Sequence, residues 1–430
     1  MGDHGKISEF GYHSTTSINY VSKGNPPGEV TDLFFGKLKG NGSKIFLMDE
    51  EGGITDMTGS AFRFRFDKRV IRHYDHVFVW GEKSRPYIEA NTDKFTVVGN
   101  PRFDTANAKT AYINPEFDVI KFLDGYDKKI LVNTSFGSGN NRQESLERLH
   151  EVTEQIMGAH YSREEFDLYI QNQRLLILYM KKMVRILAEK YPDTAFVLRP
   201  HPSEKPDTYF DLAESHKNVF VDQNRKLSAL VLATLFDLVI HHDCTTGIEA
   251  LINKNRVIAY VPVHTEYCQH LPIESSRRIE TLDGIVDVIE NLRAGSLDES
   301  EFIPKNLEEI RSYIMNFASD EENASEIARI CMDLAADDSS SNLESLIKEL
   351  KDSEHDIKLT AKQKIMGSAK RLLYYSKYKK HDARKKRIHQ QKRGVLSNED
   401  VTHMLDRLNK EYNTQVQLHS AGNGVFVLSK

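Results

Sequence analysis

Short apolar runs rich in β-branched and aromatic residues alternate along most of this chain with longer segments of helical period. Crossovers between parallel strands are usually helices, so this alternation predicts an α/β fold built on parallel sheets. In the first part of the chain the expected strands are 15–21, 44–49, 76–80 and 95–99, with helices near 28–39, 59–73 and 82–91 between them.

A second series of strand signals follows an irregular, polar region at 100–127. Its expected strands are 128–134, 194–200, 218–221, 238–242 and 256–261, with a long helix at 161–190. Helices near 281–293, 305–318 and 323–336 come after the last strand. The pattern therefore predicts two doubly wound, Rossmann-type domains in tandem, followed by a helical C-terminal extension.

These signals suggest four segments of the chain. Residues 1–127 form a first Rossmann-like domain, and residues 128–300 form a second one that binds the ligand. A helical closing segment and an acidic, Ser-rich linker occupy 301–355. Residues 356–430 form a basic extension that ends in a small helix and a hairpin.

Composition narrows the class of protein. The chain has 430 residues, of which 28% are charged, and it holds no apolar run of about 18 residues that could span a bilayer. Its first residues lack the apolar core of a signal peptide, so we expect a cytoplasmic protein. Its three cysteines are widely spaced, which supports neither a disulfide framework nor a thiolate zinc site.

The formal net charge of -5 hides a strongly basic segment at 362–393. Leu and Tyr are interleaved with the cations there, as in a helix that lies on an anionic membrane surface. A solvated helix and a nucleic-acid patch are the alternatives. We expect no specific nucleic-acid partner, and we interpret the segment as a peripheral membrane contact.

Ligands of open α/β sheets bind beyond the carboxyl ends of the strands, so the loops that follow the strands are where function is sought. Four such loops carry polar or charged residues in this chain. They are Asp49 to Gly53, Asn133 to Gly137, Arg199 to Pro202, and Asp243 to Gly247.

The loop at 243–247 runs from a strand into a helix. Unpaired N–H groups at a helix start and the helix dipole favour an anion, and the hydroxyls of Thr245 and Thr246 add donors. The loop is therefore a candidate phosphate site, which includes Gly247. The alternative is that Asp243 or Thr245 only caps the helix.

The stretch "VLRPHPSE" places Arg199 and His201 after one strand and between prolines, which restrict the backbone. A guanidinium binds phosphate through several donors, and a histidine can donate a hydrogen bond or a proton to a leaving phosphate oxygen. We interpret this pair as functional, although a single histidine in a loop is more often structural.

Three adjacent acids, Asp49, Glu50 and Glu51, precede two glycines at another strand end. Adjacent carboxylates raise one another's pKa, which suits a general base, whereas the alternative is a solvated acidic loop.

Asn133 and Ser135 are a weaker candidate contact, because their loop matches neither a Walker loop nor GxGxxG. The histidines at 241, 242, 264 and 270 show no metal-binding spacing, so a metal is not needed.

In this order, "DEEGG", "RPHP" and "HHDCTTGIEAL" resemble motifs of bacterial surface-carbohydrate glycosyltransferases of GT-B fold. Similar groups are the capsular polysialyltransferases and the Kdo transferases of lipopolysaccharide synthesis, which use CMP-activated sugars. The matching positions are Glu50-Glu51-Gly52, His201-Pro202 and Thr245-Thr246. "FVWGEKSRPYI", "FTVVGNPRFD" and "ILVNTSFGSGNN" also look like stretches of this family.

The resemblance implies transfer of a sugar, such as the 2-keto acid sugars Kdo or sialic acid, from a CMP donor onto a surface glycan. Glu50 or Glu51 would be the base that activates the acceptor, and His201 would assist departure of the nucleotide. The implied phosphate contacts are Arg199, Pro202, Ser203, Thr245, Thr246 and Gly247, and the implied substrate contacts are Asp49, Gly52, Asn133, Ser135 and Glu249. It implies no cofactor or metal beyond the nucleotide-sugar substrate.

Fewer than fifty residues precede "DEEGG", so we expect a shortened first domain. A polyol-phosphate transferase or a nucleotide-sugar epimerase of GT-B-like fold is an alternative enzyme. A non-catalytic assembly protein of the same fold is the alternative from another class.

Overall fold

The computed structural model describes part of the chain, which divides into two compact units. One unit comprises Val21–Pro27 and Phe46–Cys331, and the other comprises Met1–Tyr20, Gly28–Ile45 and Met332–Lys430. The described residues are 19–22, 29–40, 42–49, 66–104, 113–141, 162–265, 268, 270–317, 319 and 323–335, with isolated positions from 402 to 415 and the two stretches 417–420 and 426–429.

The larger sheet has six strands in the order β10-β9-β8-β5-β6-β7, and every neighbouring pair is parallel. Counted from β5 in chain order, this is the 3-2-1-4-5-6 order of a Rossmann sheet. The α/β prediction is therefore confirmed. The strands are β5 (Lys128–Asn133), β6 (Thr194–Arg199), β7 (Val219–Val221), β8 (Leu238–His241), β9 (Val257–Tyr260) and β10 (Arg277–Ile279).

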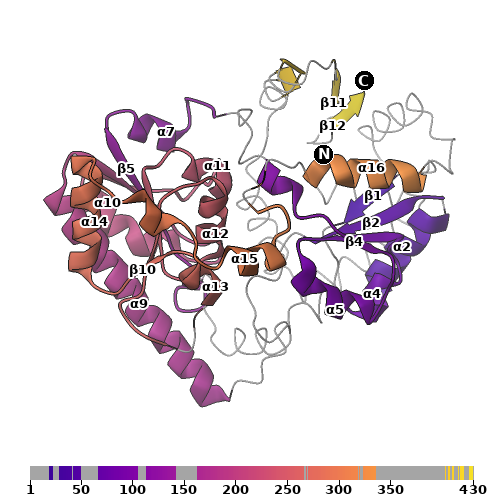
Figure 1. The fold of residues 1–430 in the computed structure, drawn as a ribbon, viewed down its shortest axis with the longest axis horizontal. Helices are drawn as coiled ribbons and strands as arrows, with labels where there is room; N and C mark the ends of the chain where they lie inside the picture. Colours follow the sequence, from indigo (N-terminus) through magenta and orange to yellow (C-terminus); the bar gives the residue numbers. More distant parts are fainter. Residues whose placement is uncertain are drawn as a thin grey trace, which may run out of the picture. The chain divides into compact units, whose positions relative to one another are not determined.

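Both faces of this sheet are buried, because successive residues of its strands join different apolar clusters. Ile130 and Val132 of β5 belong to one cluster, whereas Leu131 belongs to the other. Side chains point to alternate faces of a strand, so two layers of helices are needed to cover a sheet that is apolar throughout. Figure 1 shows helices on both sides of these strands.

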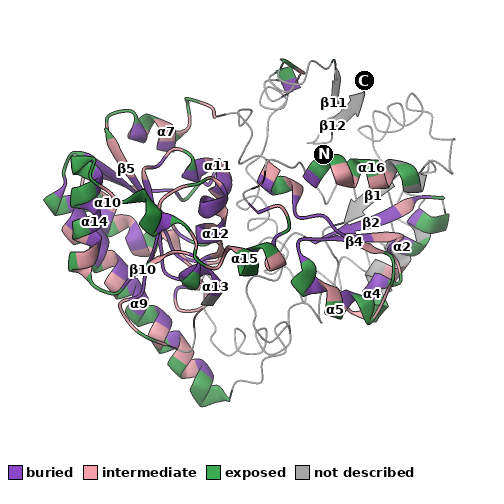
Figure 2. Cartoon of the chain, viewed as in Figure 1, coloured by how far each residue is buried: buried purple, intermediate pink, exposed green. Residues whose placement is uncertain are grey.

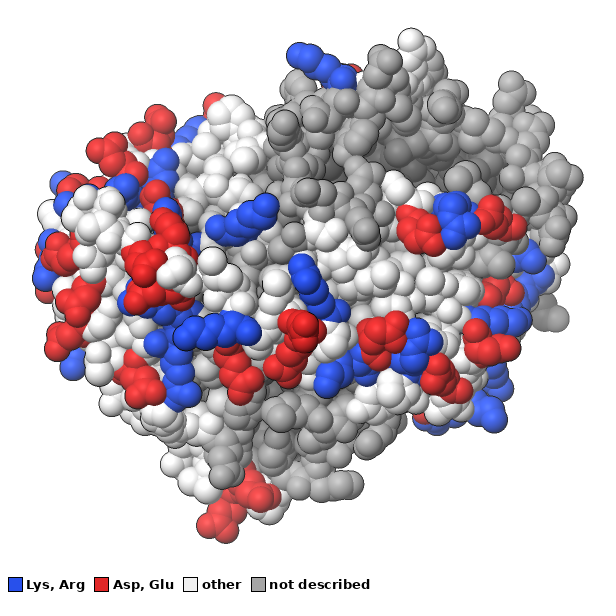
Figure 3. Space-filling model, viewed as in Figure 1, with Lys and Arg blue, Asp and Glu red and all other residues white. Residues whose placement is uncertain are grey.

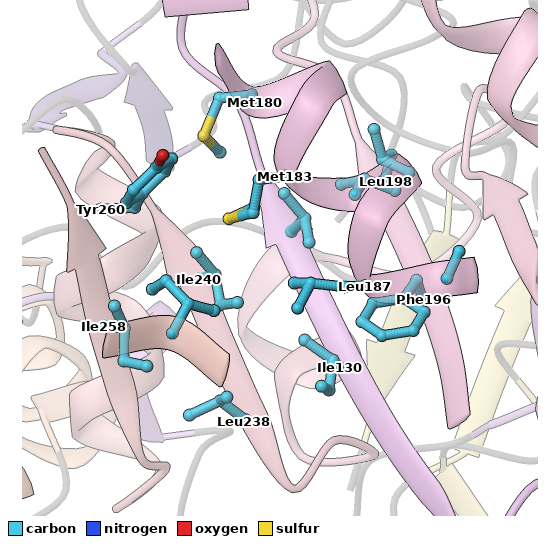
Figure 4. Close-up of a cluster of buried hydrophobic side chains, with 14 of the residues drawn as sticks. Ile130, Met180, Met183, Leu187, Phe196, Leu198, Leu238, Ile240, Ile258 and Tyr260 are labelled. Carbon is cyan, nitrogen blue, oxygen red and sulfur yellow. The ribbon is translucent and has the colours of Figure 1, made fainter. Parts of the chain in front are cut away.

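The long helix α9 (Arg163–Lys190) covers one face of the sheet. A capping box starts it, because Ser162 Oγ accepts from the N–H of Glu165 while the Glu165 carboxylate accepts from the N–H of Ser162. Figure 4 shows Met180, Met183 and Leu187 of this helix in one apolar cluster with Ile240 and other strand residues.

Shorter helices complete the two layers around the larger sheet. They are α7 (Asp118–Leu123), η3 (Pro206–Tyr209), α10 (Phe210–Ser215), α11 (Ala229–Ala233), α12 (Thr245–Ile252), α13 (His270–Glu274), α14 (Leu282–Ala294), η4 (Glu299–Phe302) and α15 (Leu307–Tyr313).

The smaller sheet has four strands in the order β1-β2-β3-β4, and β2, β3 and β4 run parallel. Phe46 and Phe78 of this sheet pack with Ile327 and Ile330 of α16. Figure 2 shows its central strands as mainly buried. In chain order, the elements before α7 are β1 (Asn19–Ser22), α2 (Glu29–Gly40), β2 (Lys44–Met48), α4 (Lys68–Ile71), β3 (His76–Val79), η1 (Glu82–Ser84), α5 (Arg85–Glu89), β4 (Phe95–Val97) and η2 (Pro101–Phe103), and α16 (Asn323–Ala335) follows α15.

The sequence prediction missed several short elements, among them α7 and β10. The strand β10 has only three residues, two of them arginines, and it joins the sheet at an edge by pairing with β9. Near the end of the chain β11 (Gln417–Ser420) pairs antiparallel with β12 (Phe426–Ser429), where a hairpin was expected.

Two further observations concern the described residues alone. Their helices include none that is both long and apolar enough to cross a bilayer. Their His, Cys, Asp and Glu side chains form no group of three or more that could hold a metal ion. The basic segment 362–393 lies outside the described part of the chain.

Candidate functional site

The carboxyl ends of β5 and β8 lie side by side in the middle of the larger sheet. The strand order reverses there, since the crossover from β5 leads to β6 on one side and the chain continues from β8 to β9 on the other. Ser135, which follows β5, donates a 2.5 Å hydrogen bond from Oγ to Oδ1 of Asp243, which follows β8. The structure thus joins two of the predicted loops at the switch point where open α/β sheets bind ligands.

The loop after β6 also meets the loop after β5. A Cβ atom added to Gly137 would lie 1.9 Å from Ser203 Oγ and 3.6 Å from His201 Nδ1. A side chain at position 137 would collide with Ser203, so the close approach of the two loops requires glycine there. Its neighbours Ser138 and Gly139 are held from the other side, where their N–H groups donate to Oε1 of Gln173.

A buried carboxylate, Glu204, ties these two loops together. Glu204 is 0% exposed, and its oxygens accept hydrogen bonds from donors on both loops and on η3. Burial and the Glu204 charge raise the pKa of Tyr209, so this phenol stays a donor. The donors are Thr134 Oγ1 at 2.7 Å, the N–H groups of Phe136 and His201 at 3.0 Å, Tyr209 Oη at 2.6 Å and Asn140 Nδ2 at 3.3 Å.

The buried guanidinium of Arg225 holds the loop after β6 by donating hydrogen bonds to backbone carbonyl groups of that loop. Arg225 Nη2 donates to the carbonyl oxygens of Pro200 at 2.7 Å and of His201 at 3.0 Å. The main chain at His201 is thus held at its N–H by Glu204 and at its C=O by Arg225. The loop is fixed by charged side chains rather than by its prolines alone.

The predicted phosphate contact Arg199 has close partners within the protein. Its Nη1 donates to Oδ2 of Asp222 at 2.5 Å, and its Nη2 donates to the carbonyl oxygen of Leu227 at 2.9 Å. The side chains of Arg199 and Asp222 are only 11% and 6% exposed. Arg199 therefore braces the loop that carries Asp222, and direct contact with a phosphate remains a prediction.

The exposed side chain of His201 has a defined tautomer when it is neutral. The N–H of Ser203 lies 3.2 Å from His201 Nδ1, and the Ser203 hydroxyl lies 2.6 Å from the same nitrogen. A backbone N–H can only donate, so Nδ1 is the acceptor and the ring proton resides on Nε2. Ser203, an implied phosphate contact, is thus the partner that orients the imidazole.

The histidine before the β8 loop, His241, is fully buried. Its Nε2 lies 3.0 Å from Ser276 Oγ, whose own proton is donated to the carbonyl oxygen of Pro272, so Nε2 carries the ring proton. Burial lowers the pKa of His241 to about 3, and the neighbouring His242 adds to this effect. A Cβ atom on Gly247 would lie 2.4 Å from that Nε2, so Gly247 allows the start of α12 to pack on the ring.

The first turn of α12 begins at Cys244, and no side chain caps it there. Thr246 Oγ1 donates instead to Cys244 Sγ at 3.0 Å, and the hydroxyls of Thr245 and Thr246 belong to half-buried residues. Burial raises the pKa of the Cys244 thiol to about 12, so the thiol stays protonated. The first N–H groups and the helix dipole thus favour an anion at this end.

Three buried polar atoms near the ends of β5 and β8 have no hydrogen-bond partner among the described residues. They are Asn133 Oδ1, His241 Nδ1 and His242 Nε2. The His242 Nδ1 lies 2.9 Å from the Tyr260 carbonyl oxygen and therefore carries the ring proton, which leaves Nε2 as an acceptor. Such atoms are rare in folded proteins, and they are commonly satisfied by water or a ligand.

Several other predicted residues are not part of the loops that meet at the ends of β5, β6 and β8, or already have a partner within the protein. Asp49 follows β2 in the smaller sheet, is 2% exposed, and its carbonyl oxygen accepts from Trp80 Nε1. Glu50, Glu51 and Gly52 lie outside the described residues, so their roles stay predictions. Glu249 of α12 accepts from Arg102 Nη2 at 2.8 Å, which gives this glutamate a partner within the protein.

Sequence reasoning missed Glu204 and Arg225, the two residues that hold the β6 loop. Glu204 stands in the quoted stretch "VLRPHPSE", directly after Ser203, but an acid in a loop usually faces solvent. Glu204 holds the loops by accepting hydrogen bonds from donors that are far apart in the sequence, between Thr134 and Tyr209. The sequence contained one weak indication that Arg225 is functional, namely its position in a polar loop after a strand. Its positive φ of 49° is visible only in the structure.

Comparisons with known proteins complete the description of this region. No family model and no curated protein matches the sequence. Among solved structures, a UDP-N-acetylglucosamine 2-epimerase is similar at 13% identity, with 79% of this chain and 78% of that chain covered and a TM-score of 0.44. The UDP-GlcNAc 2-epimerase of Methanocaldococcus jannaschii is similar at 15% identity, 77% and 83% coverage, and a TM-score of 0.43.

The wall teichoic acid polymerase TagF is also similar, at 11% identity. The matched region covers 64% of this chain and 60% of that chain, with a TM-score of 0.39.

Proposed function

We propose that this chain is a glycosyltransferase that uses a nucleotide sugar and binds its phosphate at the ends of β5, β6 and β8. One observation carries the proposal: three strand-end loops that each contain polar donors converge at the switch point of a Rossmann sheet. The uncapped start of α12 supplies N–H groups for an anion. The unpartnered Asn133 and His242 atoms supply polar groups that a ligand or water would satisfy.

In this mechanism His201 stabilises the leaving nucleotide. Its Nε2–H donates a hydrogen bond to the phosphate oxygen as the bond between that oxygen and the anomeric carbon breaks. A donor that is already in place when negative charge develops lowers the barrier, because no reorganisation is required at that moment. Glu204 and Arg225 keep the main chain of His201 in position, and Ser203 keeps its tautomer.

The acceptor hydroxyl forms the new bond to the anomeric carbon in the same reaction. Its proton passes to a carboxylate, and we assign this role to Glu50 or Glu51. The finer part of the proposal is a CMP-linked 2-keto acid sugar as donor and a surface glycan as acceptor, as the motif resemblance implies. Its motifs are the acidic pair with Gly52, the His201-Pro202 pair and the Thr245-Thr246 pair.

The first experiment measures binding and transfer in the full chain. Isothermal titration with CMP, UDP and CDP-glycerol identifies the nucleotide, and the matching donor sugar is then assayed for transfer to a glycan acceptor. His201→Ala should lower the turnover by about 100-fold or more, because a positioned proton or hydrogen-bond donor contributes that much. His264→Ala replaces another exposed histidine and serves as the control.

The folded state of the His201→Ala protein should be unchanged, because the side chain is exposed. Wild-type turnover in this variant would contradict the role of His201. Binding of UDP or CDP-glycerol in place of CMP would point to an epimerase or a polyol-phosphate transferase. A chain that binds no nucleotide would be an assembly protein.

A further inference from the structure

The outer face of α9 carries a row of exposed leucines. Leu168, Leu175 and Leu178 are 49%, 42% and 64% exposed, whereas Met180, Val184 and other residues of the same helix are buried against the sheet. At 100° per residue the two apolar rows lie on nearly opposite sides of the helix. Figure 2 shows much of α9 in the colour of exposed residues. The helix therefore has an exposed apolar side in addition to the apolar side that packs on the sheet.

The spacing of this row is that of a coiled-coil seam. Consecutive members follow one another by four and three residues in turn, which is the a and d pattern of a heptad repeat. The members are Glu164, Leu168, Gln171, Leu175, Leu178 and Lys182, and all six residues are exposed. We call this set the α9 stripe.

The α9 stripe has opposite charges at its two ends. Glu164 begins it and Lys182 ends it. The first turns of α9 also carry Glu165 and the Arg163–Asp167 ion pair, and Figure 3 shows acidic side chains at this end of the helix. The second half carries Lys181, Lys182 and Arg185. A partner that fits the stripe must therefore offer cations to one end, leucines to the middle and acids to the other end.

We propose that the α9 stripe pairs antiparallel with the α9 stripe of a second copy of this chain. A two-fold axis near position 173 makes the two surfaces self-complementary. Glu164 then faces Lys182 of the partner subunit, Leu168 faces Leu178 of the partner subunit, and Gln171 faces Leu175 of the partner subunit. A parallel pair would instead place Glu164 against Glu164 of the partner subunit and would repel.

The test uses the full chain and sedimentation equilibrium, with the protomer mass of 49.3 kDa as reference. Between about 1 and 100 µM the wild-type mass should rise from one protomer toward two. Leu168→Glu and Leu178→Glu should each weaken the dimer by about 100-fold or more, because each substitution is present twice and removes an apolar contact. Ile303→Glu is the matched control, since Ile303 is 64% exposed on another segment.

Charge reversal tests the direction of the pair. Glu164→Lys alone and Lys182→Glu alone should each weaken the dimer, because both ends then repel. The double variant should recover the wild-type association, since both attractive pairs are restored with exchanged signs. In a parallel dimer this recovery would not occur.

Three results would overturn the proposal. They are a wild-type chain that stays monomeric over the whole range, a dimer that survives both leucine substitutions, and a double charge reversal that does not recover association. Circular dichroism of each variant confirms that α9 is still helical, so that loss of the dimer reports on the stripe itself. A monomeric wild-type chain would leave the stripe to a partner of another kind.

Discussion

The loop after β6 and the carboxyl end of β8 each carry a histidine, but they hold it in opposite ways. His201 has an exposed ring, and its main chain is hydrogen-bonded to Glu204 through the N–H and to Arg225 through the carbonyl oxygen. His241 has a buried, neutral ring on which Gly247 packs. The first arrangement leaves a side chain exposed on a main chain that is held in place. The second uses its side chain as packing, so that what the loop can offer is the start of α12.

This difference changes the expected role of each loop. Glu204 and Arg225 support the main chain of the β6 loop, and chemistry is assigned to His201. At the end of β8 and in the loop after it, His241 and His242 are buried, and the N–H groups of the first turn of α12 are the candidate anion contacts. Substitutions in the supporting residues should therefore separate the two arrangements.

The largest effect is expected for Glu204→Gln. An amide has one acceptor oxygen in place of a carboxylate that accepts from five donors, and its NH₂ group would face donors. The free energy of unfolding should fall by about 3 to 4 kcal/mol, measured by urea denaturation. In the surviving folded protein, turnover should fall more than nucleotide affinity, because His201 loses its position.

Glu214→Gln is the control for this substitution, since Glu214 is an exposed residue of α10. It should change the free energy of unfolding by less than about 0.5 kcal/mol. Equal effects of the two substitutions would show that the β6 loop does not depend on the buried carboxylate.

A smaller effect is expected for Gly247→Ala. The added methyl group would lie 2.4 Å from His241 Nε2 and 2.7 Å from two ring carbons, and the buried ring has little room to move. We expect a loss of about 2 to 3 kcal/mol in the free energy of unfolding. Gly125→Ala, where a Cβ atom meets nothing within 4 Å, is the control and should leave stability nearly unchanged. A Gly247→Ala protein as stable as the control would refute tight packing on His241.

The pH dependence of stability should report His241. Its pKa is about 3 in the folded protein and near the ordinary value of 6.5 in the unfolded chain, so the unfolded chain binds more protons below pH 6.5. Stability should therefore fall as the pH drops through 6.5, by about 2 kcal/mol from this residue at pH 5. His241→Gln should lose less stability than the wild type between pH 7.5 and about 5. Equal losses in both proteins would contradict a buried, neutral His241.

Much of the fold was predictable from local pattern. The strands that carry the candidate site were expected within a residue or two of their observed bounds, because buried parallel strands are continuous apolar runs. The helix expected at 161–190 is observed at 163–190. The prediction missed β10, whose three residues include two arginines and whose strand character depends on pairing with β9.

The candidate site was predicted in outline only. The sequence drew attention to Ser135, His201 and Thr245, and the sheet brings their loops together. The supporting residues Glu204 and Arg225 were not foreseen, because a buried charge is defined by partners that lie far away in the sequence. Arg199 was predicted as a phosphate contact, and its close partners Asp222 and Leu227 appear only in the structure.

What the sequence determined by itself was the alternation of strands and helices, the places where strands end, and the residue types found there. Those features depend on periodicity and on proline and glycine, which act over a few residues. Only the tertiary structure decided which polar groups are buried, which histidine is exposed, and which tautomer each ring adopts. Burial and hydrogen bonding depend on atoms from distant segments, so the same residue type became a candidate catalytic group at His201 and packing at His241.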